Sequence, residues 1–321
     1  MTTTPSTAGA ARAGGPPPVA HPGPGARRPR RHPRGSWEAY VYLAPAVLLV
    51  GTFAGYPLLR STWFAFNDVN PFTGIQGFVG LANVGDVLAR EDIGLLTRNT
   101  VVWTVGTVLL QLLLGLVAAH LLNSRFPLRG VYRGLAMIPW ATPSVLVALM
   151  WIWILEPNHG VLNGALRGLG IIDRPIAFLG EATTALPSLV AVAVWQGVPL
   201  FAVMILAALQ SVPPELREAA SMDGCGRPGV FRHVVLPAIL PTILITTLLR
   251  LIWTTNYVDL ILIMTGGGPG RASTNLSLEA YVTAYKAMDF GRGAAYAVTQ
   301  AAVLSLLVVL YVRLTGKRAG R

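Results

Sequence analysis

Six long apolar runs constrain the fold of this chain more than any other feature of its sequence. A helix needs about 20 predominantly apolar residues to cross the hydrocarbon core of a bilayer, and each run meets that length. Nothing in the sequence alternates like the strands of a membrane barrel. The runs therefore predict an all-α integral membrane protein with six transmembrane helices. They occupy approximately residues 41–63, 100–122, 134–155, 187–208, 240–264 and 293–314.

The composition supports a membrane protein. Hydrophobic residues make up 53% of the chain and charged residues only 12%, whereas a soluble domain carries about 25% charged residues. The net charge of +11 would suggest nucleic acid as a partner of a soluble protein. In a membrane protein the excess has a simpler cause, because positive charge collects in cytoplasmic loops. We therefore expect a lipid bilayer as the environment and no nucleic acid partner.

Residues 1–36 differ from the rest of the chain, since they are rich in Pro, Gly, Ala and Arg. Such a segment has too few apolar residues to offset the entropy of ordering, which predicts a disordered basic cytoplasmic tail. A cleaved signal peptide is the alternative. The apolar run that follows is too long for the core of a signal peptide, which favours a retained signal anchor. Residues 37–321 then form one membrane domain.

The distribution of Lys and Arg predicts the orientation. Sixteen of the 25 basic residues lie in the N-terminal tail, the connections 123–133 and 209–237, and the C-terminus. The other connections hold seven. Because cytoplasmic loops are enriched in Lys and Arg, we expect both termini and the connection 209–237 in the cytoplasm.

The sequence predicts no catalytic or metal site in this chain. Cys225 is the only cysteine, so neither an internal disulfide nor a cysteine cluster can form. No HExxH, paired CxxC or GxxxxGK[ST] motif is present. An intramembrane enzyme would need a paired nucleophile and base, but His120, His159 and His233 lie in different segments. If the protein uses ATP, another chain must bind it.

The connection 209–237 predicts a short helix–turn–helix. Pro214 suits the start of a helix, where the first amides lack intrahelical partners. Glu215 follows at a position where the helix dipole favours negative charge. Gly224 then permits a sharp turn. A second short helix is expected to begin near Pro228.

The spacing in this connection resembles that of the inner-membrane permeases of binding-protein-dependent ABC importers. Their hallmark is EAA, three residues, Gly, nine residues and a short apolar stretch with LP. This chain has Glu218-Ala219-Ala220, then Gly224, then Leu236-Pro237. Two features depart from the pattern. Cys225 stands where Ala is usual, and residues 226–229 are rich in Gly and Pro.

Other segments resemble the maltose-type carbohydrate permeases within that family. The similarity covers roughly residues 38–315 and leaves out the tail. The combination of the EAA spacing with a TGGGP stretch is specific, whereas EAA alone would be weak. The segments are Arg129-Gly130 with Arg133 before Pro139-Trp140, Trp195 with Pro199, Thr265-Gly266-Gly267-Gly268-Pro269, Tyr281 with Tyr285, and residues 291–295.

The resemblance implies the architecture and mechanism of a type I ABC importer permease in the bacterial plasma membrane. The connection would dock into a cleft of a cytoplasmic ATPase dimer, which holds ATP and Mg, while this chain binds no cofactor. A second homologous permease chain and an extracytoplasmic solute-binding protein would complete the importer. An ordinary solvated connection is the alternative. The implied coupling residues are Glu218, Ala219, Ala220, Asp223, Gly224, Phe231, Leu236 and Pro237.

Two charged residues fall within the fifth apolar run, Arg250 and Asp259. Each costs about 2.5–3.5 kcal/mol at the centre of a spanning helix, so such residues face the bundle interior or a wet cavity. On one continuous helix they would project to opposite faces and make no ion pair. Asn256 and Asp259 are three apart and would share a face.

The same segment, Trp253 to Asp259, resembles the W-x-F-N-x-F-D pattern of carbohydrate permeases at Trp253, Asn256 and Asp259. Hydroxylated solutes need hydrogen-bond partners and an apolar platform, and this segment offers both. Hydrogen bonding between helices is the alternative, and it also favours polar side chains in membranes. The candidate solute-path residues are Trp253, Asn256, Tyr257 and Asp259.

Other transport functions remain as alternatives to carbohydrate import. A permease of the same family could take another small polar solute such as glycerol phosphate. A secondary transporter or channel would work without an ATPase and often shows two related halves. No internal repeat of that kind is evident in the sequence. Within the importer class, the TGGGP stretch resembles that of carbohydrate permeases, and this resemblance favours carbohydrate over amino acids or phosphate as the solute.

Overall fold

In the computed structural model, residues 36–124 and 127–319 are described, and most of them are helical. The chain divides into two compact units, residues 1–56 and 57–321. The tail predicted for residues 1–36 lies outside the described residues except for Ser36. The first unit holds α1 (Ser36–Val50) and a π-helical segment, η1 (Gly51–Gly55). Exposed apolar side chains, among them Tyr42 and Phe53, cover both segments.

The second unit contains the remaining elements, and α2 begins at its boundary. In order they are α2 (Tyr56–Phe64), β1 (Asn67–Asn70), β2 (Gly74–Phe78), α3 (Ala82–Leu88), α4 (Ile93–Val101), η2 (Val102–Gly106), α5 (Thr107–Asn123), α6 (Arg129–Ala136), α7 (Ile138–Ala141), α8 (Ser144–Ile154), α9 (Val161–Gly168), α10 (Ala185–Ser211), α11 (Pro214–Met222), α12 (Arg227–Val230), η3 (Phe231–Val235), α13 (Leu236–Thr255), α14 (Asp259–Met264), α15 (Leu276–Tyr281), η4 (Val282–Lys286) and α16 (Phe290–Ala319). The two strands form an antiparallel hairpin in which Asn67 pairs with Phe78.

Five helical stretches are long and apolar enough to cross a membrane: Tyr40–Phe64, Ile93–Asn123, Ala185–Ser211, Arg227–Thr255 and Phe290–Leu314. A bent pair, Arg129–Ala141 with Ser144–Ile154, makes six if it counts as one span. The described residues thus hold five or six candidate spans.

The third apolar run is not the straight helix that its length suggests. Its two parts meet at an angle of 94°. Thr142 and Pro143 separate them, both with extended backbone. Proline lacks an amide hydrogen and disfavours helical geometry in the residue before it, which explains the break.

The fifth apolar run is also interrupted, because α13 ends at Thr255 and α14 begins at Asp259. Side chains from other elements donate hydrogen bonds to the carbonyl groups at the break. Trp103 Nε1 donates to Thr254 O at 2.8 Å, and Gln300 Nε2 and Ser277 Oγ donate to Thr255 O. A helix can end at membrane depth only where its free backbone groups find such partners.

The core of the second unit lies around α10, whose inner face is buried along most of its length. Helix α10 packs on α5 and α13, and a buried side chain, Gln111, donates from α5 to Ala193 O at 2.8 Å. Leu189, Phe201 and Ile205 are fully buried there. Long-range packing on α10 therefore fixes α5 and α13 beside each other.

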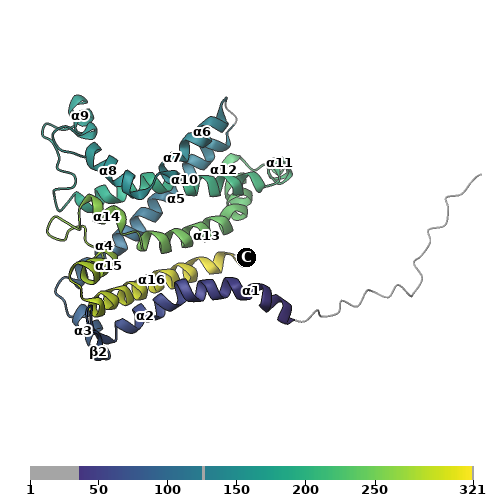
Figure 1. The fold of residues 1–321 in the computed structure, drawn as a ribbon. Helices are drawn as coiled ribbons and strands as arrows, with labels where there is room; N and C mark the ends of the chain where they lie inside the picture. Colours follow the sequence, from purple (N-terminus) through teal and green to yellow (C-terminus); the bar gives the residue numbers. More distant parts are fainter. Residues whose placement is uncertain (1–35, 125–126, 320–321) are drawn as a thin grey trace, which may run out of the picture. The chain divides into compact units, whose positions relative to one another are not determined.

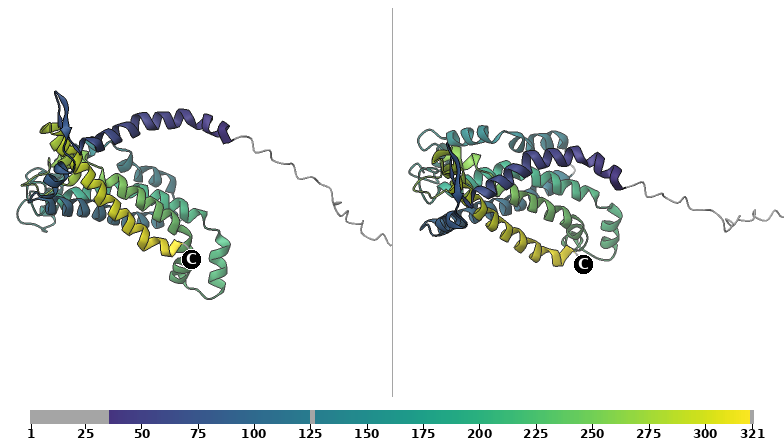
Figure 2. Two further views of the ribbon diagram at one scale, coloured as in Figure 1. Left: turned by 90° about the horizontal axis from the view of Figure 1, so that it is seen from below. Right: turned by 60° about the horizontal axis from the view of Figure 1, so that its bottom comes forward.

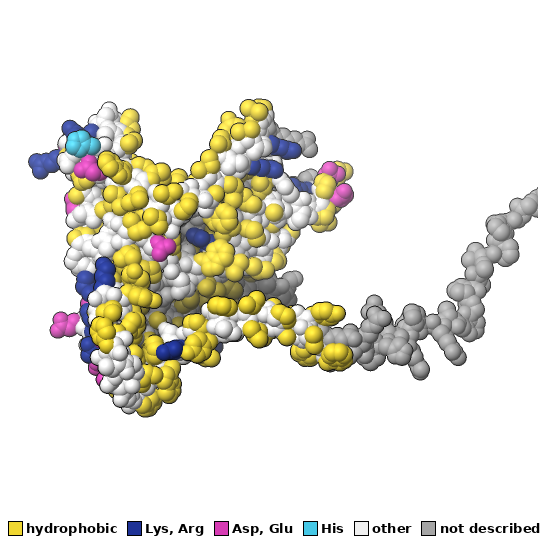
Figure 3. Space-filling model, in the orientation of Figure 1, with side chains coloured by type: hydrophobic (Ala, Val, Ile, Leu, Met, Phe, Trp, Pro, Cys, Tyr) yellow, Lys and Arg dark blue, Asp and Glu magenta, His cyan; other side chains and the backbone are white. Residues whose placement is uncertain are grey.

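The two ends of the second unit carry different elements (Figure 1). The hairpin, α3 and α15 lie at one end, and α11, α12 and the last turns of α16 lie at the other. Figure 2 shows the same separation from two more directions. Between the ends, the visible surface is mostly hydrophobic, and charged side chains gather towards the ends (Figure 3). This distribution suits a unit that crosses a bilayer.

Candidate functional site

The connection after α10 folds as the predicted helix–turn–helix. Helix α11 begins at Pro214, and α12 begins at Arg227, one residue before Pro228. Between them Gly224 has a φ of +84°, a left-handed conformation that side chains with a Cβ rarely adopt. The amide of Cys225 donates to Ala220 O at 3.0 Å and closes the turn. Gly224 thus occupies the turn between the two helices, where the sequence predicts it.

The outer side of α11 is exposed and partly apolar. Glu218 and Ala219 are exposed, as the resemblance requires of docking residues. Two large apolar side chains join them, Leu216 at 53% and Met222 at 88% exposure. An apolar surface of this kind rimmed by charge is typical of a protein interaction site.

The inner side of the same segment is attached to the bundle. Arg217 Nη2 donates to Leu209 O, the last turn of α10, at 2.6 Å. Phe231 packs edge-on against His120 of α5, with ring centroids 6.4 Å apart. These contacts attach α11 and the segment after it to α10 and α5.

The other predicted coupling residues lie partly on the exposed outer side of this segment and partly on the inner side that is attached to the bundle. Asp223 and Pro237 are exposed, whereas Ala220, Phe231 and Leu236 are half-buried. Phe231, Leu236 and Ala220 therefore hold the segment against its own bundle, while Glu218, Ala219 and Asp223 remain accessible to another protein.

A second site is a cavity of about 220 Å³ at the level of the membrane helices. Trp253 and Tyr257, two of the four candidate solute-path residues, line it. The Tyr257 hydroxyl donates to Gln196 Oε1 at 2.6 Å. Hydroxyl, amide and guanidinium groups face the same space as two indole rings. The lining residues are Trp140, Ser144, Gln196, Gly197, Arg250, Trp253, Thr254 and Tyr257.

Arg250 lies in this cavity wall within a chain of hydrogen bonds. Its Nε donates to Gln111 Oε1 at 2.9 Å, and Gln111 Nε2 donates in turn to Ala193 O. Gly197 leaves room for both side chains. A Cβ at that position would lie 2.1 Å from Gln111 Nε2 and 2.6 Å from Arg250 Nη2.

Asn256 and Asp259 do not share a helix face, contrary to the expectation from their spacing, because the helix is broken between them. Asn256 Oδ1 accepts a hydrogen bond from Gln300 of α16 at 3.1 Å. Asp259 Oδ2 accepts one from Ser144 of α8 at 3.2 Å. Neither lines the cavity. Both make the contacts between helices that were the alternative to solute binding.

The predicted lack of an ion pair between Arg250 and Asp259 holds among the described residues, but for a different reason. The prediction placed them on opposite faces of one continuous helix. In the structure Arg250 belongs to α13 and Asp259 opens α14, and each binds a different neutral partner.

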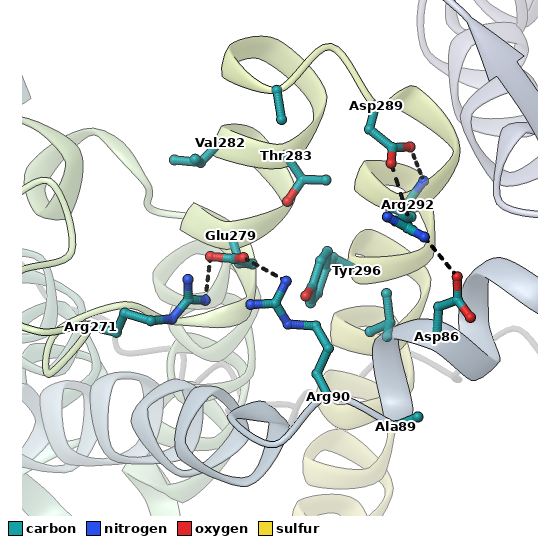
Figure 4. A pocket seen from close by; sticks show the side chains of 12 residues that line it. Asp86, Ala89, Arg90, Arg271, Glu279, Val282, Thr283, Asp289, Arg292 and Tyr296 are labelled. Atoms are coloured by element: carbon teal, nitrogen blue, oxygen red, sulfur yellow. Dashed lines mark hydrogen bonds and ion pairs between the residues drawn. The ribbon is translucent and has the colours of Figure 1, made fainter.

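The opposite end of the unit carries a network of ion pairs around a cavity of about 590 Å³ (Figure 4). Arg271 Nε lies 2.8 Å from Asp92 Oδ2, and Arg271 Nη2 lies 2.7 Å from Glu279 Oε2. Arg90 contacts both acids. A hydrogen bond from Arg90 and the nearby charge of Arg271 hold the pKa of Asp92 below its ordinary value. The network connects Arg271, two residues after the TGGGP stretch, to the start of α4 and to α15.

Several residues of these sites escape sequence reasoning. Arg217 and Gln111 carry no motif, and their partners are backbone carbonyls that only the fold brings near. Gln196 and Ser144 are single polar residues in apolar runs. A polar residue in a spanning segment is itself a signal, and applied to Gln111 and Gln196 it would have indicated the cavity.

Comparison with known proteins places the chain among transport proteins. A family model described as "Binding-protein-dependent transport system inner membrane component" matches residues 111–318. The trehalose/maltose transport system permease protein MalF of Thermococcus litoralis is 32% identical over 274 residues, which cover 85% of this chain and 92% of that protein. The diacetylchitobiose uptake system permease protein NgcF of Streptomyces coelicolor is 33% identical over 320 residues, with coverages of 93% and 90%.

A solved structure has the same fold. It is a crystal structure of a bacterial ABC transporter involved in the import of the acidic polysaccharide alginate. The TM-score is 0.75 at 22% sequence identity, and the match covers 88% of this chain and 96% of that one. The fold of the described residues is therefore that of an ABC importer permease.

Proposed function

The chain belongs to the family of binding-protein-dependent transport system inner membrane components, and from this premise we propose that it is a transmembrane subunit of an ATP-driven carbohydrate importer. The observation that carries the proposal is the α11 surface, where Glu218 and Ala219 face outward above the Gly224 turn. A surface that is exposed on one side and bonded to α10 on the other suits a contact that transmits force.

The bent pair α6–α7 and α8 would serve as the third of six spans, with both termini in the cytoplasm. Two observations support this orientation. The Lys and Arg residues gather in the connections of one side, and the last turns of α16 lie at the same end as α11 and α12 (Figure 1). The bacterial plasma membrane is the proposed location.

The sole cysteine provides a test of this orientation. Cys225 lies in the turn between α11 and α12. In intact spheroplasts a membrane-impermeant maleimide should leave Cys225 unmodified, whereas a permeant maleimide should modify it. Rapid modification by the impermeant reagent would place the loop outside and reject the orientation.

Three further components would complete the importer. A cytoplasmic ATPase dimer would bind ATP and Mg and receive α11 in a cleft, with Glu218 as a polar contact. This chain would bind no cofactor of its own. A second homologous permease chain would form the other half of the pathway, and an extracytoplasmic binding protein would deliver the solute.

Carbohydrate is the proposed solute class for two reasons. Relatives that are 32% and 33% identical over most of the chain are named for trehalose/maltose and for diacetylchitobiose. The membrane cavity also combines indole rings with hydroxyl and amide groups, which suits a hydroxylated ring. Trp253 and Tyr257 are the proposed contacts. A small phosphorylated polyol such as glycerol phosphate is the second candidate, which Arg250 in the cavity wall favours.

Uptake and ATP hydrolysis test the proposal together. The full-length chain, purified with its associated subunits in proteoliposomes, should hydrolyse ATP faster when the binding protein and its saccharide are added. The chain purified alone should hydrolyse none. Saccharide uptake that continues without ATP or an ATPase subunit would instead support a secondary transporter.

A further inference from the structure

Arg250 is a charged residue at membrane depth with no acidic partner. In the described ranges, 36–124 and 127–319, no ion pair includes it, and its one hydrogen bond goes from Nε to the neutral amide of Gln111. Gln111 is itself fully buried and bonded to the backbone of α10. The positive charge is thus held firmly in place but is not neutralised.

The free end of the guanidinium faces the cavity. Arg250 is one of its lining residues, and neither Nη atom has a hydrogen bond within the part of the chain that the structure describes. Gly197 lets the guanidinium lie close to the backbone of α10, since a Cβ there would lie only 2.6 Å from Nη2. Two N–H groups in a planar arrangement are therefore available to a ligand.

Asp259 does not neutralise the charge of Arg250. It is not a lining residue and makes no ion pair with Arg250, although its carboxylate lies directly behind the wall, where it accepts a hydrogen bond from Ser144. The remaining polar groups of the wall, on Ser144, Gln196, Thr254 and Tyr257, are neutral. The lining as a whole therefore carries one positive charge.

An unpaired charge at this depth is costly, and intramembrane ionisable residues occur where a pathway uses them. A planar guanidinium binds carboxylate and phosphate oxygens through two parallel hydrogen bonds. Building on the proposed transport function, we propose that the solute in this cavity carries a carboxylate or phosphate on a hydroxylated carbon skeleton, and that Arg250 binds this anionic group. Gln111 and Gly197 would position the guanidinium.

The cavity also limits how much of the solute enters it. Its volume of about 220 Å³ lies below the range of about 300–1,000 Å³ of pockets that enclose a drug-sized ligand. One ring or one terminal group fits this volume, with its anionic substituent on Arg250. The rest of a longer solute would lie outside.

Two matched pairs of probes test the proposal. Methyl β-glucuronide differs from methyl β-glucoside only at C6, where a carboxylate replaces the hydroxymethyl group, and glycerol 3-phosphate differs from glycerol only in its phosphate. Their dissociation constants would be measured by ligand-observed NMR on the full-length chain with its associated subunits in lipid nanodiscs. We expect at least one anionic probe to bind about tenfold or more tightly than its neutral counterpart, and the pair that does so distinguishes an acidic sugar from a phosphorylated polyol.

Variants at Arg250 test whether the charge causes the preference. Arg250→Gln should abolish the difference between anionic and neutral probes, and Arg250→Lys, which keeps the charge but not the planar fork, should retain part of it. Arg98→Gln, which removes an exposed charge on α4, is the matched control and should change nothing. A purely structural role would weaken all probes equally, and thermal unfolding of each variant would detect loss of fold.

The outcomes separate the two proposals. Equal affinity for the glucuronide and the glucoside, with no preference for glycerol 3-phosphate, would overturn the anionic solute but leave carbohydrate import standing. If a carboxylate of the second permease chain neutralises Arg250, the anionic solute is likewise overturned and carbohydrate import still stands. No binding of any probe at tens of millimolar would overturn both the anionic solute and the assignment of this cavity to the pathway.

Discussion

The α11 surface and the membrane cavity are built in different ways. The α11 surface comes from one contiguous stretch, Pro214 to Val235, whose helices and turn follow local rules. The cavity collects residues from four helices, from Trp140 on α7 to Thr254 on α13, together with Tyr257 between α13 and α14. The first region can therefore be recognised from sequence, whereas the second depends on packing.

The difference also concerns tolerance to change. Glu218, Ala219 and Met222 are exposed on α11, so substitutions there should affect a partner more than the fold. The wall of the cavity is a network in which Arg250, Gln111 and Gly197 are mutually in contact. Contacting residues do not act independently, so a change at one should displace the others.

The largest effect is expected for Gly224→Pro. Proline fixes φ near −65°, whereas Gly224 has a φ of +84°, so the turn between α11 and α12 cannot form. We expect complete loss of solute-stimulated ATP hydrolysis while the membrane spans still insert. Gly226→Ala is the matched control, because Gly226 has a φ of −66° and an added Cβ would meet only Pro228 Cδ, at an ordinary 3.9 Å. Normal transport by Gly224→Pro would reject a coupling role for this turn.

Gly197→Ala should have the next largest effect, in the cavity. The added methyl group would collide with Gln111 Nε2 and Arg250 Nη2, and overpacking of this kind costs about 1–3 kcal/mol. Denaturant unfolding in detergent should show that loss, and binding of the solute should weaken. Gly106→Ala, at a helical glycine with no neighbour within 4 Å, should leave both unchanged. Equal stability of the two variants would contradict the described packing.

Glu218→Ala should reduce coupling without reducing stability. Glu218 is exposed, and truncation of a polar contact at an interface costs about 1–2 kcal/mol, which is roughly tenfold in affinity for the ATPase. Glu215→Ala, one turn earlier on the same exposed helix, is the control and should have little effect. The affinity would be measured by titration of the purified ATPase. Equal losses at both positions would indicate general charge attraction instead of a specific contact.

The smallest effect is expected at the opposite end, in the ion-pair network. The pKa of Asp92 is lowered below its ordinary value of 3.8, so its ion pairs stabilise the fold above that pH and are lost as the pH falls through the lowered pKa. The stabilisation is modest because Arg90 and Arg271 are partly exposed to solvent. Asp92→Asn should flatten this acid-side loss in thermal unfolding, and Asp68→Asn, at an exposed position, should not. An unchanged pH profile for Asp92→Asn would show that the network adds no stability.

These two regions also show what sequence can predict. The length of the apolar runs correctly predicts the helical membrane class, and Pro214 and Gly224 correctly predict the limits of α11 because helix starts and left-handed turns are local properties. Periodicity failed at Thr142–Pro143 and at Asn256, where the chain leaves the helix. At Asn256 the helix ends because of tertiary contacts. Trp103, Ser277 and Gln300 donate hydrogen bonds to the carbonyl groups of its last turn.

The candidate solute path was predictable only in part for the same reason. Trp253 and Tyr257 do line the cavity, but Asn256 and Asp259 are turned to α16 and α8 by the break. The partners that define the cavity, Gln111, Gln196 and Gly197, lie on α5 and α10, far away in sequence. Their proximity follows from helix packing, which a single sequence does not reveal.

Site-specific photocrosslinking tests the coupling role of α11 most directly. A benzoylphenylalanine in place of Met222, which is 88% exposed on α11, would be compared with one in place of Phe72, which is 86% exposed at the hairpin on the opposite end. In the assembled importer we predict that position 222 crosslinks to the ATP-hydrolysing subunit and that position 72 does not. An intact, active importer in which position 222 gives no such product, or in which position 72 does, would contradict the account.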